Sequence, residues 1–443
     1  MIKRYDSYKD SRVEWIGEIP STWNLNKVGN NTYVKGRIGW KGLRSEDFKE
    51  KGPFLITGTD FRKNGTIDWE NMYHVDQWRY DEDPFIQLQD NDVLITKDGT
   101  IGKVVYVGNL KGQTCLNSGI FLTRPTNNEY HSRFFFWVLN SNVFEVFVDY
   151  NSGGSTIQHL YQNVFVNFKF PIPPLSEQQQ IVSFLDTKTS LIDSLIEKTQ
   201  RKIELLKEKR TSLINEVVTK GLNPNVELKD SGVEWIGEIP FHWGIGKLYQ
   251  YSEMSNGSTP SRVKPEYWEN GTIPWMSSGE INKKKIRDID GRITQEGFEN
   301  SSTKILPIGT VMMGLNGQGK TKGTVGILEI ETTCNQSLCG MIFKDNMYPM
   351  FSYYFLDSQY YHIRGLVGEG QREGISVSFL GRYPLVVPPI SEQQQIVKYL
   401  DEQTELIDNT ISIEEKRIEL LKEYRQSLIS EVVTGKLKVT TDE

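Results

Sequence analysis

Cysteine, histidine and long apolar runs are scarce in this chain of 443 residues. The three cysteines, Cys115, Cys334 and Cys339, form no Cys-x-x-Cys pair, which argues against a disulfide framework and against a zinc-binding cluster. The five histidines have no metal-ligand spacing. No stretch of roughly 18 apolar residues is present, and residues 1–12 (MIKRYDSYKDSR) contain no apolar run. We therefore expect a soluble, cytoplasmic protein with reduced thiols, no metal, no signal peptide and no membrane span.

An excess of positive charge is also missing. The chain has 51 Lys and Arg against 57 Asp and Glu, and its formal net charge is −6. This balance argues against a protein that coats nucleic acid non-specifically, because such binding depends on neutralising phosphates. A protein that recognises a DNA sequence through a few local basic loops is still compatible with this net charge. The length is sufficient for about two to four domains, each with its own core.

The dominant feature of the sequence is a long segment that occurs twice. Residues 173–221 and 388–436 align at a constant offset of 215, with 30 identities in 49 positions. Both copies begin Pro-Pro, and Ser176 and Ser391 follow as expected N-caps with a Gln three residues later. Gly221 is expected to end the first copy. Each copy is predicted to be one helix of about 42 residues, roughly 60 Å long at 1.5 Å per residue.

Both predicted helices carry an apolar seam with alternating spacings of three and four residues, which is typical of a coiled coil. Each seam needs a partner, either the other copy in this chain or, as an antiparallel contact, another chain. The polar seam residues Thr199, Arg210, Glu414 and Arg425 fix the register or bind a partner, and the sequence leaves this choice open. The predicted seam residues are Leu185, Ile192, Ile196, Ile203, Leu206 and Leu213 in the first copy, and Leu400, Ile407, Ile411, Ile418, Leu421 and Leu428 in the second.

A second, shorter repeat precedes each half. Residues 10–23 (DSRVEWIGEIPSTW) and 230–243 (DSGVEWIGEIPFHW), here termed the lead-in segments, share 11 of 14 positions. The chain is therefore a tandem duplication of lead-in segment, variable region and long helix. The predicted domains are 1–172 (lead-in segment and first globular domain), 173–229 (long helix and linker), 230–387 (lead-in segment and second globular domain) and 388–443 (second long helix).

The two variable regions, 24–172 and 244–387, differ in sequence but share the same order of Gly-containing loops and apolar stretches. β-Branched and aromatic residues interrupted by Gly and Asn predict strands and tight turns, and amphipathic patterns predict short helices. Strands are expected within 52–61, 92–107, 271–281 and 309–328, and helices near 132–148 and 350–362. The predicted fold class is α+β: two mixed α/β domains joined by a pair of long antiparallel coiled-coil helices, with a pseudo-two-fold internal repeat.

The linker after the first helix constrains the arrangement. It has about nine residues and spans at most roughly 30 Å, about half of the helix length. The second globular domain must therefore begin near the far end of the first helix. The second helix then runs back, and the first lead-in segment is expected near its end.

Motifs for catalysis are missing. Residues 314–321 (GLNGQGKT) match the P-loop pattern, but the following KGTVGI predicts a strand where a P-loop needs a helix. We interpret this stretch as a Gly-rich turn that is structural or faces DNA. Residues 223–226 (NPNV) are not the NPPY-type tetrad of amino-methyltransferases, and Asp60 and Asp98 are interpreted as turn formers. The chain is therefore predicted to be non-catalytic and to hold no cofactor.

Side chains suited to reading base edges gather in the Gly-rich loops of both variable regions. Arg and Lys can bridge guanine, Asn and Gln can bridge adenine, and Ser and Thr contact either a base or a phosphate. Solvated turns are the alternative interpretation for each residue, and the basic run 283–287 (KKKIR) is equally a phosphate contact or a solvated face. The candidate DNA-binding residues are Arg37, Trp40, Lys41, Arg44, Thr96, Lys97, Ser155, Thr156 and Gln158 in the first half, and Ser258, Thr259, Ser261, Arg262, Lys264, Asn316, Gln318, Lys320, Lys322, Gln371 and Arg372 in the second.

The order of these parts resembles a known family. A variable domain and a PPLSEQQQI helix, then a variable domain and a PPISEQQQI helix, with VEWIGEIP before each domain, are similar over essentially the whole chain to the specificity (S) subunit of type I restriction–modification enzymes. The resemblance implies that each variable domain is a target recognition domain for one half of a bipartite, asymmetric sequence in double-stranded DNA. It also implies that the helices set the half-site spacing and dock two modification subunits.

Further partners follow from the same resemblance. The modification (methyltransferase) subunits are expected to carry S-adenosylmethionine and to methylate adenine, and a separate motor-nuclease restriction subunit is expected to cut DNA. The target sequence and the spacer length do not follow from it. The alternative is a coiled-coil scaffold or adaptor protein that reads no DNA sequence.

Overall fold

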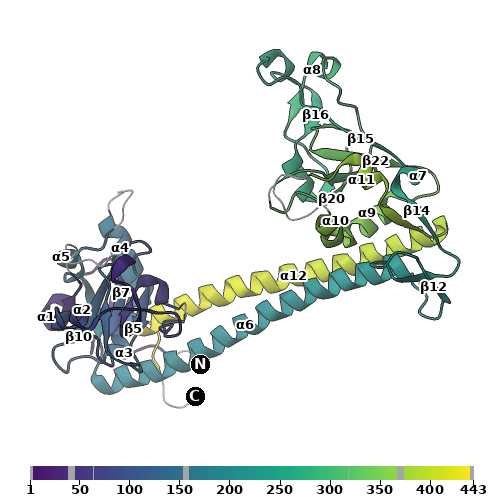
Figure 1. Cartoon of the computed structure of the whole chain (residues 1–443). Coiled ribbons are helices and arrows are strands. Elements are labelled where there is room, and N and C mark those ends of the chain that lie inside the picture. Colours follow the sequence, from purple (N-terminus) through teal and green to yellow (C-terminus); the bar gives the residue numbers. More distant parts are fainter. Residues whose placement is uncertain are drawn as a thin grey trace. The chain divides into compact units, whose positions relative to one another are not determined.

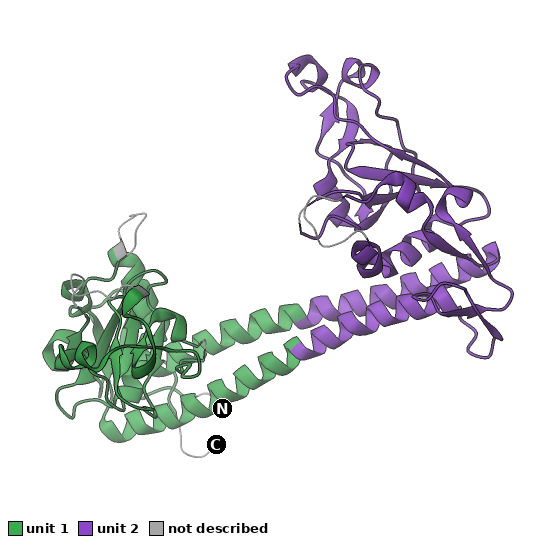
Figure 2. Cartoon of the chain, viewed as in Figure 1, with its two compact units in different colours: residues 1–200, 415–443 green, residues 201–414 purple. Residues whose placement is uncertain are grey.

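The structure is a computed structural model that describes residues 3–37, 45–62, 64–152, 159–317, 319–366 and 374–439. The chain forms two compact units, coloured separately in Figure 2. Unit 1 comprises Met1–Gln200 and Glu415–Glu443, and unit 2 comprises Arg201–Glu414. Whereas the predicted domains follow sequence order and separate the helices from the globular regions, each compact unit contains one globular region and part of both long helices.

The two long predicted helices are present as α6 (Leu175–Lys220) and α12 (Ile390–Val433), shown in Figure 1. The expected N-caps are wrong, because both helices begin before Ser176 and Ser391. The carbonyls of the preceding prolines accept the first bonds, from the backbone N–H groups of Gln178 (3.0 Å) and Gln393 (3.1 Å). Proline can begin a helix because its fixed φ is helical and its missing N–H would have no helical acceptor there. Gly221 follows α6 with φ +77°, as predicted for a C-terminal glycine.

The two helices pair with each other in an antiparallel sense within both units. Three ion pairs join the helices, and from one pair to the next the residue number rises on α6 while it falls on α12, which shows the antiparallel direction. The charged seam residues therefore take partners across the helix pair and fix its register. The pairs are Arg425–Asp193 (2.9 Å) in unit 1, and Lys202–Glu414 (2.5 Å) and Arg210–Asp408 (2.9 Å) in unit 2.

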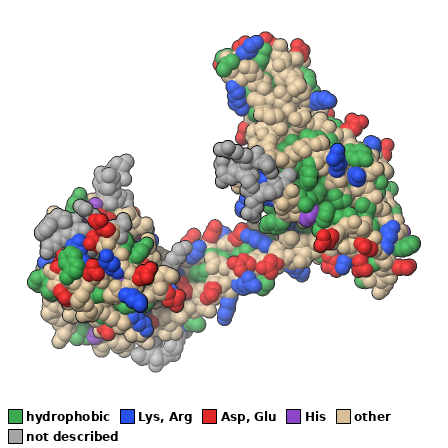
Figure 3. All heavy atoms as spheres, viewed as in Figure 1, with side chains coloured by type: hydrophobic (Ala, Val, Ile, Leu, Met, Phe, Trp, Pro, Cys, Tyr) green, Lys and Arg blue, Asp and Glu red, His purple; other side chains and the backbone are tan. Residues whose placement is uncertain are grey.

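The twelve predicted seam residues are buried or half-buried. Figure 3 shows acidic and basic side chains interspersed on the visible face of the helices. Exposed ion pairs along one helix, such as Arg201–Glu204 (2.9 Å), are part of this polar surface of the helices. Of the predicted seam residues, those that are buried are Leu185, Ile192, Ile203, Leu400, Ile407, Ile411, Ile418 and Leu428, and those that are half-buried are Ile196, Leu206, Leu213 and Leu421.

The globular region of unit 1 is a mixed α/β fold. Its strands form the antiparallel sheet β4-β10-β7-β8, the smaller sheet β6-β5-β9 and the pairs β1–β2 and β11–β3. The predicted helix near 132–148 is present as two helices, α3 and α4. The elements are β1 (Tyr8–Asp10), β2 (Glu18–Pro20), β3 (Asn24–Lys27), α1 (Val28–Asn31), β4 (Thr32–Lys35), β5 (Lys49–Ile56), β6 (Tyr73–His74), α2 (Gln77–Asp81), β7 (Val93–Thr96), β8 (Val104–Tyr106), β9 (Thr114–Leu116), β10 (Ile120–Pro125), α3 (Ser132–Leu139), α4 (Asn142–Ser152), α5 (Gln162–Phe165) and β11 (Lys169–Ile172).

Unit 2 repeats this arrangement. The sheet β15-β22-β19-β20-β17 corresponds to β4-β10-β7-β8 with one added strand, β18-β16-β21 corresponds to β6-β5-β9, and β14–β23 corresponds to β3–β11. The internal duplication and the α+β class are therefore confirmed. The elements are β12 (Leu228–Asp230), β13 (Glu238–Pro240), β14 (Gly244–Lys247), α7 (Leu248–Tyr251), β15 (Ser252–Asn256), β16 (Ile273–Met276), β17 (Lys285–Ile286), β18 (Arg292–Ile293), α8 (Gln295–Glu299), β19 (Val311–Gly314), β20 (Val325–Leu328), β21 (Thr333–Cys334), β22 (Leu338–Phe343), α9 (Pro349–Ser358), α10 (Tyr360–Leu366), α11 (Val377–Gly381) and β23 (Pro384–Val387).

The first turn of each long helix attaches its globular region through two consecutive side chains. In unit 1, Glu177 accepts a hydrogen bond from Trp23 Nε1 (3.0 Å) at the end of the lead-in segment. The adjacent Gln178 is fully buried. Its Nε2 donates to the carbonyls of Glu129 (3.0 Å) and Pro173 (2.8 Å), and its Oε1 accepts from the backbone N–H of His131 (2.9 Å).

Unit 2 repeats the same contacts with the second copy of the motif. Glu392 accepts from Trp243 Nε1 (3.0 Å), and Gln393 is fully buried. Gln393 binds the backbone of Asn346, Tyr348 and Pro388 at 3.2, 2.7 and 2.8 Å. The repeated Ser-Glu-Gln-Gln-Gln sequence is therefore an attachment motif, and the first of its three glutamines contributes the buried hydrogen bonds.

The lead-in segments lie against the C-terminal ends of the helices, as the linker length predicted. In unit 1, a Cβ on Gly435 would lie 2.4 Å from Pro20 of the lead-in segment, and the OH of Tyr8, just before this segment, donates to the carbonyl of Gly435 (3.1 Å). In unit 2, a Cβ on Gly221 would lie 3.1 Å from the ring of Trp243. Both glycines have positive φ, so the same close approach of lead-in segment and helix end occurs in each unit.

Candidate nucleic-acid interface

Several loops that are distant in the sequence of unit 1 meet at one end of its main sheet. The strand register places the end of β4 beside the start of β10, since Lys35 pairs with Leu122. The end of β7 lies beside the same start of β10, since Thr96 pairs with Ile120. The loops that follow β4 and β7 and the turn before β10 therefore project from one end of the sheet, here termed the loop end of unit 1.

The corresponding strands give unit 2 a loop end of the same construction. Asn256 at the end of β15 pairs with Cys339 of β22, and Gly314 at the end of β19 pairs with Leu338. Met313 pairs with Val325 of β20, so the loop between these strands also begins and ends there. The candidate DNA-binding residues that the structure describes come from separate stretches of sequence, and the strand order brings the strand ends that carry these stretches together.

Hydrogen bonds fix the loops of unit 1 to one another. The backbone N–H of Lys97 donates to the carbonyl of Gly119, and the N–H of Leu160 donates to the carbonyl of Lys97, both at 2.9 Å. Asp98 Oδ1 is in hydrogen-bond contact with His159 Nδ1, and the His159 ring packs 4.4 Å from the ring of Tyr161. Lys97 lies 5.3 Å from the centroid of the Phe121 ring. These contacts therefore hold the loop after β7 against the turn before β10 and against residues 159–161, and they present Lys97 together with the exposed Tyr161.

Equivalent contacts hold the loops of unit 2. Thr259 Oγ1 donates to Gln336 Oε1 (2.6 Å) and joins the loop after β15 to the turn before β22. The backbone N–H of Leu315 donates to the carbonyl of Ser337, and that of Ile375 donates to the carbonyl of Leu315, both at 2.8 Å. The loops after β15 and β19 are therefore both joined to the turn before β22, and the loop after β19 is also joined to Ile375. Among the candidates, Ser258 and Thr259 are half-buried, and Ser261, Arg262, Lys264, Asn316 and Lys320 are exposed.

Arg37 is a correction to the candidate set, because its side chain belongs to the core. It is 2% exposed, and its guanidinium pairs with Glu82 (2.9 Å) and donates to the carbonyl of Leu116 (2.8 Å). Burying this cation is tolerable only because it is paired and hydrogen-bonded. Breaking these contacts to reach DNA would lose the ion pair with Glu82 and leave the carbonyl of Leu116 without this donor, so Arg37 is not a DNA contact.

Two further candidates are also too buried to contact DNA directly. Thr96 is 3% exposed; its hydroxyl donates to the carbonyl of Thr100 (2.5 Å) and accepts from the N–H of Lys103 (3.0 Å). Thr96 therefore shapes the loop after β7. Lys322 is 8% exposed. The candidates that lie outside the described residues are Trp40, Lys41, Arg44, Ser155, Thr156, Gln158, Gln318, Gln371 and Arg372.

The basic run 283–287 has its charge largely compensated within unit 2. Lys285 and Ile286 form β17, which pairs in parallel with β20. Each of the four cations of the run lies close to a carboxylate, which favours a structural role over a phosphate contact. The pairs are Lys283–Asp288 (3.1 Å), Lys284–Asp357 (2.5 Å), Lys285–Asp401 (3.8 Å) and Arg287–Glu329 (2.6 Å).

The P-loop match is a β-hairpin connection, as the sequence predicted. β19 ends at Gly314, and the chain returns through a turn to β20, which pairs with β19 in an antiparallel sense. The helix N-terminus that cradles phosphate in a P-loop is replaced by this strand. The segment therefore belongs to the loop end of unit 2.

Beside this hairpin lies a basic groove of about 750 Å³. It is lined by Lys320, by Arg210 of α6 and by Tyr361, which is 81% exposed. Arg364 Nη1 donates to the carbonyls of Gly319 (2.9 Å) and Lys322 (2.7 Å) and holds the hairpin loop in place. Tyr361 and Arg364 were not among the residues predicted from the sequence; the available signal was an aromatic residue three positions before an Arg.

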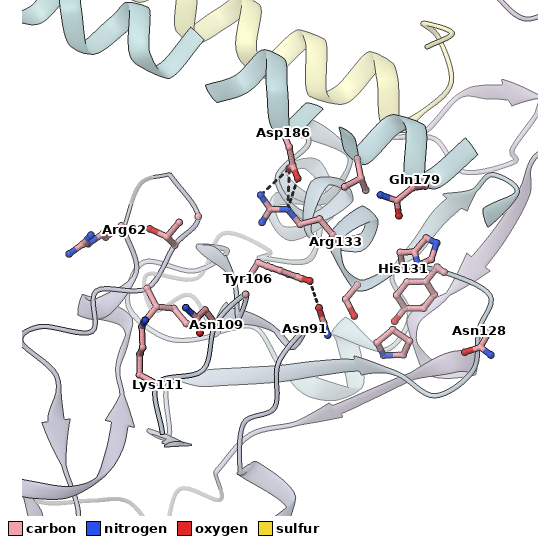
Figure 4. A pocket seen from close by; sticks show the side chains of 18 of the residues that line it. Arg62, Asn91, Tyr106, Asn109, Lys111, Asn128, His131, Arg133, Gln179 and Asp186 are labelled. Atoms are coloured by element: carbon pink, nitrogen blue, oxygen red, sulfur yellow. Dashed lines mark hydrogen bonds and ion pairs between the residues drawn. The ribbon is translucent and has the colours of Figure 1, made fainter. Parts of the chain in front are cut away.

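A larger groove of unit 1, of about 1030 Å³, lies at the opposite end of the sheet from the loop end (Figure 4). Its lining includes Asn91, just before β7, and Pro125, at the end of β10. Arg133 reaches across to Asp186 of α6, with Nη2 2.9 Å from Oδ1. Because this groove faces away from the candidate loops, we do not assign it to the same interface.

The described residues contain no group of three His, Cys, Asp or Glu placed to hold a metal ion. The three cysteines are buried and free, and burial raises the pKa of the Cys334 and Cys339 thiols to about 12. In the described part of the chain, no helix is long and apolar enough to cross a bilayer.

Comparisons with known proteins agree with this architecture. A solved chain from a study of complex assembly and conformational transition of the type I R-M system superposes with a TM-score of 0.74 at 16% identity, covering 94% of this chain and 98% of that one. The crystal structure of the HsdS subunit from Thermoanaerobacter tengcongensis gives a TM-score of 0.58 at 15% identity, covering 95% and 98%. At these identities the likeness shows a shared fold.

Sequence comparison identifies the family. The family model described as the type I restriction modification DNA specificity domain matches twice, at residues 38–205 and 240–423, and the chain belongs to this family. The chain is 25% identical over 431 residues to the type I restriction enzyme MjaVIII specificity subunit of Methanocaldococcus jannaschii, covering 95% of this chain and 94% of the relative. It is also 28% identical over 278 residues to the EcoR124I/EcoR124II specificity subunit of Escherichia coli, covering 59% and 63%.

Proposed function

We propose that this chain is the DNA sequence-specificity subunit of a type I restriction–modification complex, and that each unit reads one half of a bipartite target in double-stranded DNA through its loop end. The observation that carries the proposal is the repeated loop end. Two sheets of the same strand order present loops of different sequence, in a family defined by DNA specificity. Because the loop residues differ between the units, the two half-sites are expected to differ and the target to be asymmetric.

The helix pair is the proposed spacer and docking surface. Each helix runs unbroken from one unit into the other, so the helix length would set the half-site spacing. Apolar residues also lie on the outside of the pair, where their exposure has no structural benefit within the chain. On α12 they recur every seven residues, which suits packing against helices of two modification subunits. These residues are Leu191 (61% exposed), Leu205 (49%), Leu406 (62%), Ile413 (68%) and Leu420 (53%).

The chemistry is assigned to the partners. A modification subunit with bound S-adenosylmethionine would flip an adenine from the duplex and methylate it, and a restriction subunit would cut DNA. The two acids interpreted above as turn formers have structural partners within unit 1. Asp60 accepts from the N–H of Thr57 (2.7 Å), and Asp98 is paired with His159. This chain is proposed to be non-catalytic and to bind no cofactor.

An exchange of the first variable region tests the proposal. Residues 24–172 are replaced by those of another family member, the full chain is produced with its modification subunits, and methylated adenines are mapped by sequencing. One half-site should change and the other should stay. A change in both half-sites, or in neither, would contradict modular reading. Absence of any sequence preference in a salt-controlled DNA-binding assay of the complex would favour a scaffold protein instead.

A further inference from the structure

The loop that follows β15 in unit 2 is held rigidly by two tryptophans. Trp275 Nε1 donates to the carbonyl of Ser258, and Trp268 Nε1 donates to the carbonyl of Ser261, both at 3.0 Å. The loop also starts against β21, because the N–H of Ser258 donates to the carbonyl of Cys334 (2.9 Å). The bond to Ser258 satisfies the buried indole N–H of Trp275, and both bonds fix the loop.

Arg262, the next residue of this loop, lies against the same two rings. The carbon of its guanidinium is 4.3 Å from the ring centroid of Trp268 and 5.4 Å from that of Trp275. The two indoles meet edge to face, with centroids 5.1 Å apart and an interplanar angle of 88°. Trp275 is 4% exposed, whereas Arg262 is exposed. Cation–π contacts of this kind restrict the orientation of the guanidinium while its remaining N–H groups stay accessible.

The charge of Arg262 is not compensated in the way that other cations of unit 2 are. Among the residues that the structure describes, Arg262 has no carboxylate within ion-pair distance, whereas Arg287 pairs with Glu329 at 2.6 Å. An oriented guanidinium without an anionic partner presents a planar set of donors. Its natural complements are two acceptors side by side on one rigid group.

In double-stranded DNA, N7 and O6 of guanine form such a pair of acceptors in the major groove. A phosphate also accepts from Arg, but a mobile side chain serves that purpose equally well, so the tryptophan clamp would add little. We propose that Arg262 reads a guanine in the half-site recognised by unit 2, with its fork of N–H donors directed at N7 and O6. This inference rests on the proposed function, since it assumes that the loop end of unit 2 faces bases.

The test uses the full chain in complex with its modification subunits. Mapping of methylated adenines gives the bipartite target, and the exchange of residues 24–172 identifies the half-site of unit 2 as the half that stays. Binding of the complex is then measured on duplexes in which each G·C pair of that half-site is replaced in turn. In the unaltered complex, one replacement should weaken binding roughly tenfold to hundredfold. In Arg262→Ala, the same replacement should change binding less than about twofold, while discrimination at the other positions remains.

Two further variants distinguish recognition of guanine by Arg262 from a general effect of its positive charge and from the loss of any exposed arginine. Arg262→Lys keeps the charge but not the planar fork, and should lose discrimination at the same position. Arg287→Ala removes an exposed arginine that already has a partner, and should leave every position unchanged. A uniform loss on all duplexes with a shallower salt dependence would overturn the inference and make Arg262 a phosphate contact. A half-site without any G·C pair would overturn it too, as would unchanged discrimination in Arg262→Ala. Loss of all sequence preference in the unaltered complex would instead refute the proposed function.

Discussion

The attachment motif makes a sharp prediction about Gln178. Replacing it by Ala removes a fully buried side chain that makes three hydrogen bonds to backbone groups. The N–H of His131 then loses its acceptor, and the carbonyls of Glu129 and Pro173 each lose a donor. An orphaned partly buried donor costs about 1–3 kcal/mol and each lost bond about 1 kcal/mol, so we expect Gln178→Ala to destabilise unit 1 by about 3 kcal/mol.

Urea denaturation followed by tryptophan fluorescence measures this change, because Trp23 and Trp137 are both buried in unit 1. With a slope of about 2–3 kcal/mol per molar urea, the midpoint for unit 1 should fall by about 1 M. The control is Gln180→Ala, two positions along the same motif and exposed, for which we expect less than about 0.5 kcal/mol. Equal effects of the two substitutions would refute the reasoning. Gln393→Ala should reproduce the large effect in unit 2, where three equivalent bonds are made.

Three further predictions concern the helix pair and the acid stability of unit 2. A double-mutant cycle with Arg425→Ala and Asp193→Ala should give a coupling of about 0.5–1 kcal/mol, because this bidentate pair is partly exposed and screened. Leu400→Asp should lower the denaturation midpoint more than Leu421→Asp does, since Leu400 is fully buried and Leu421 is half-buried; the reverse order would contradict the packing of the seam. Burial lowers the pKa of His362, so the unfolded chain takes up this proton at a higher pH than the folded chain. The contribution of neutral His362 to the free energy of unfolding should therefore be complete above about pH 6.5 and decline as the pH falls below it. His362→Asn should flatten this part of the curve of unfolding free energy against pH, measured by urea denaturation at several pH values.

The helices and the duplication were predictable because their signals are local or repeated. Apolar spacing within the copies at 173–221 and 388–436 identified the seam without knowledge of any tertiary contact. The prediction that Ser176 and Ser391 are the N-caps was wrong because two sequence signals for a helix start stand next to each other. A Ser followed by Gln resembles a capping box, but the preceding proline starts the helix first.

The candidate interface was predictable only as a set of loops. That these loops share one end of each sheet depends on strand order, which no local pattern encodes. Arg37 shows the same limit for a single residue, since Glu82 lies 45 positions away and the carbonyl of Leu116 lies 79 positions away. From the sequence alone, a buried arginine with distant partners is indistinguishable from an exposed one.

The hydrogen bonds of Gln178 and Gln393 have a consequence for how this protein can change over generations. Apart from a weak contact of Gln393 Nε2 with the sulfur of Met347 (3.6 Å), the groups that these two side chains bind are backbone carbonyls and N–H groups. Such groups are supplied by any amino acid that keeps the local chain path. A globular region can therefore replace nearly all of its side chains and still satisfy the buried glutamine that joins it to its helix. A new DNA-binding preference can therefore arise when one globular region is replaced as a whole, and the long helices that carry it need no compensating mutation.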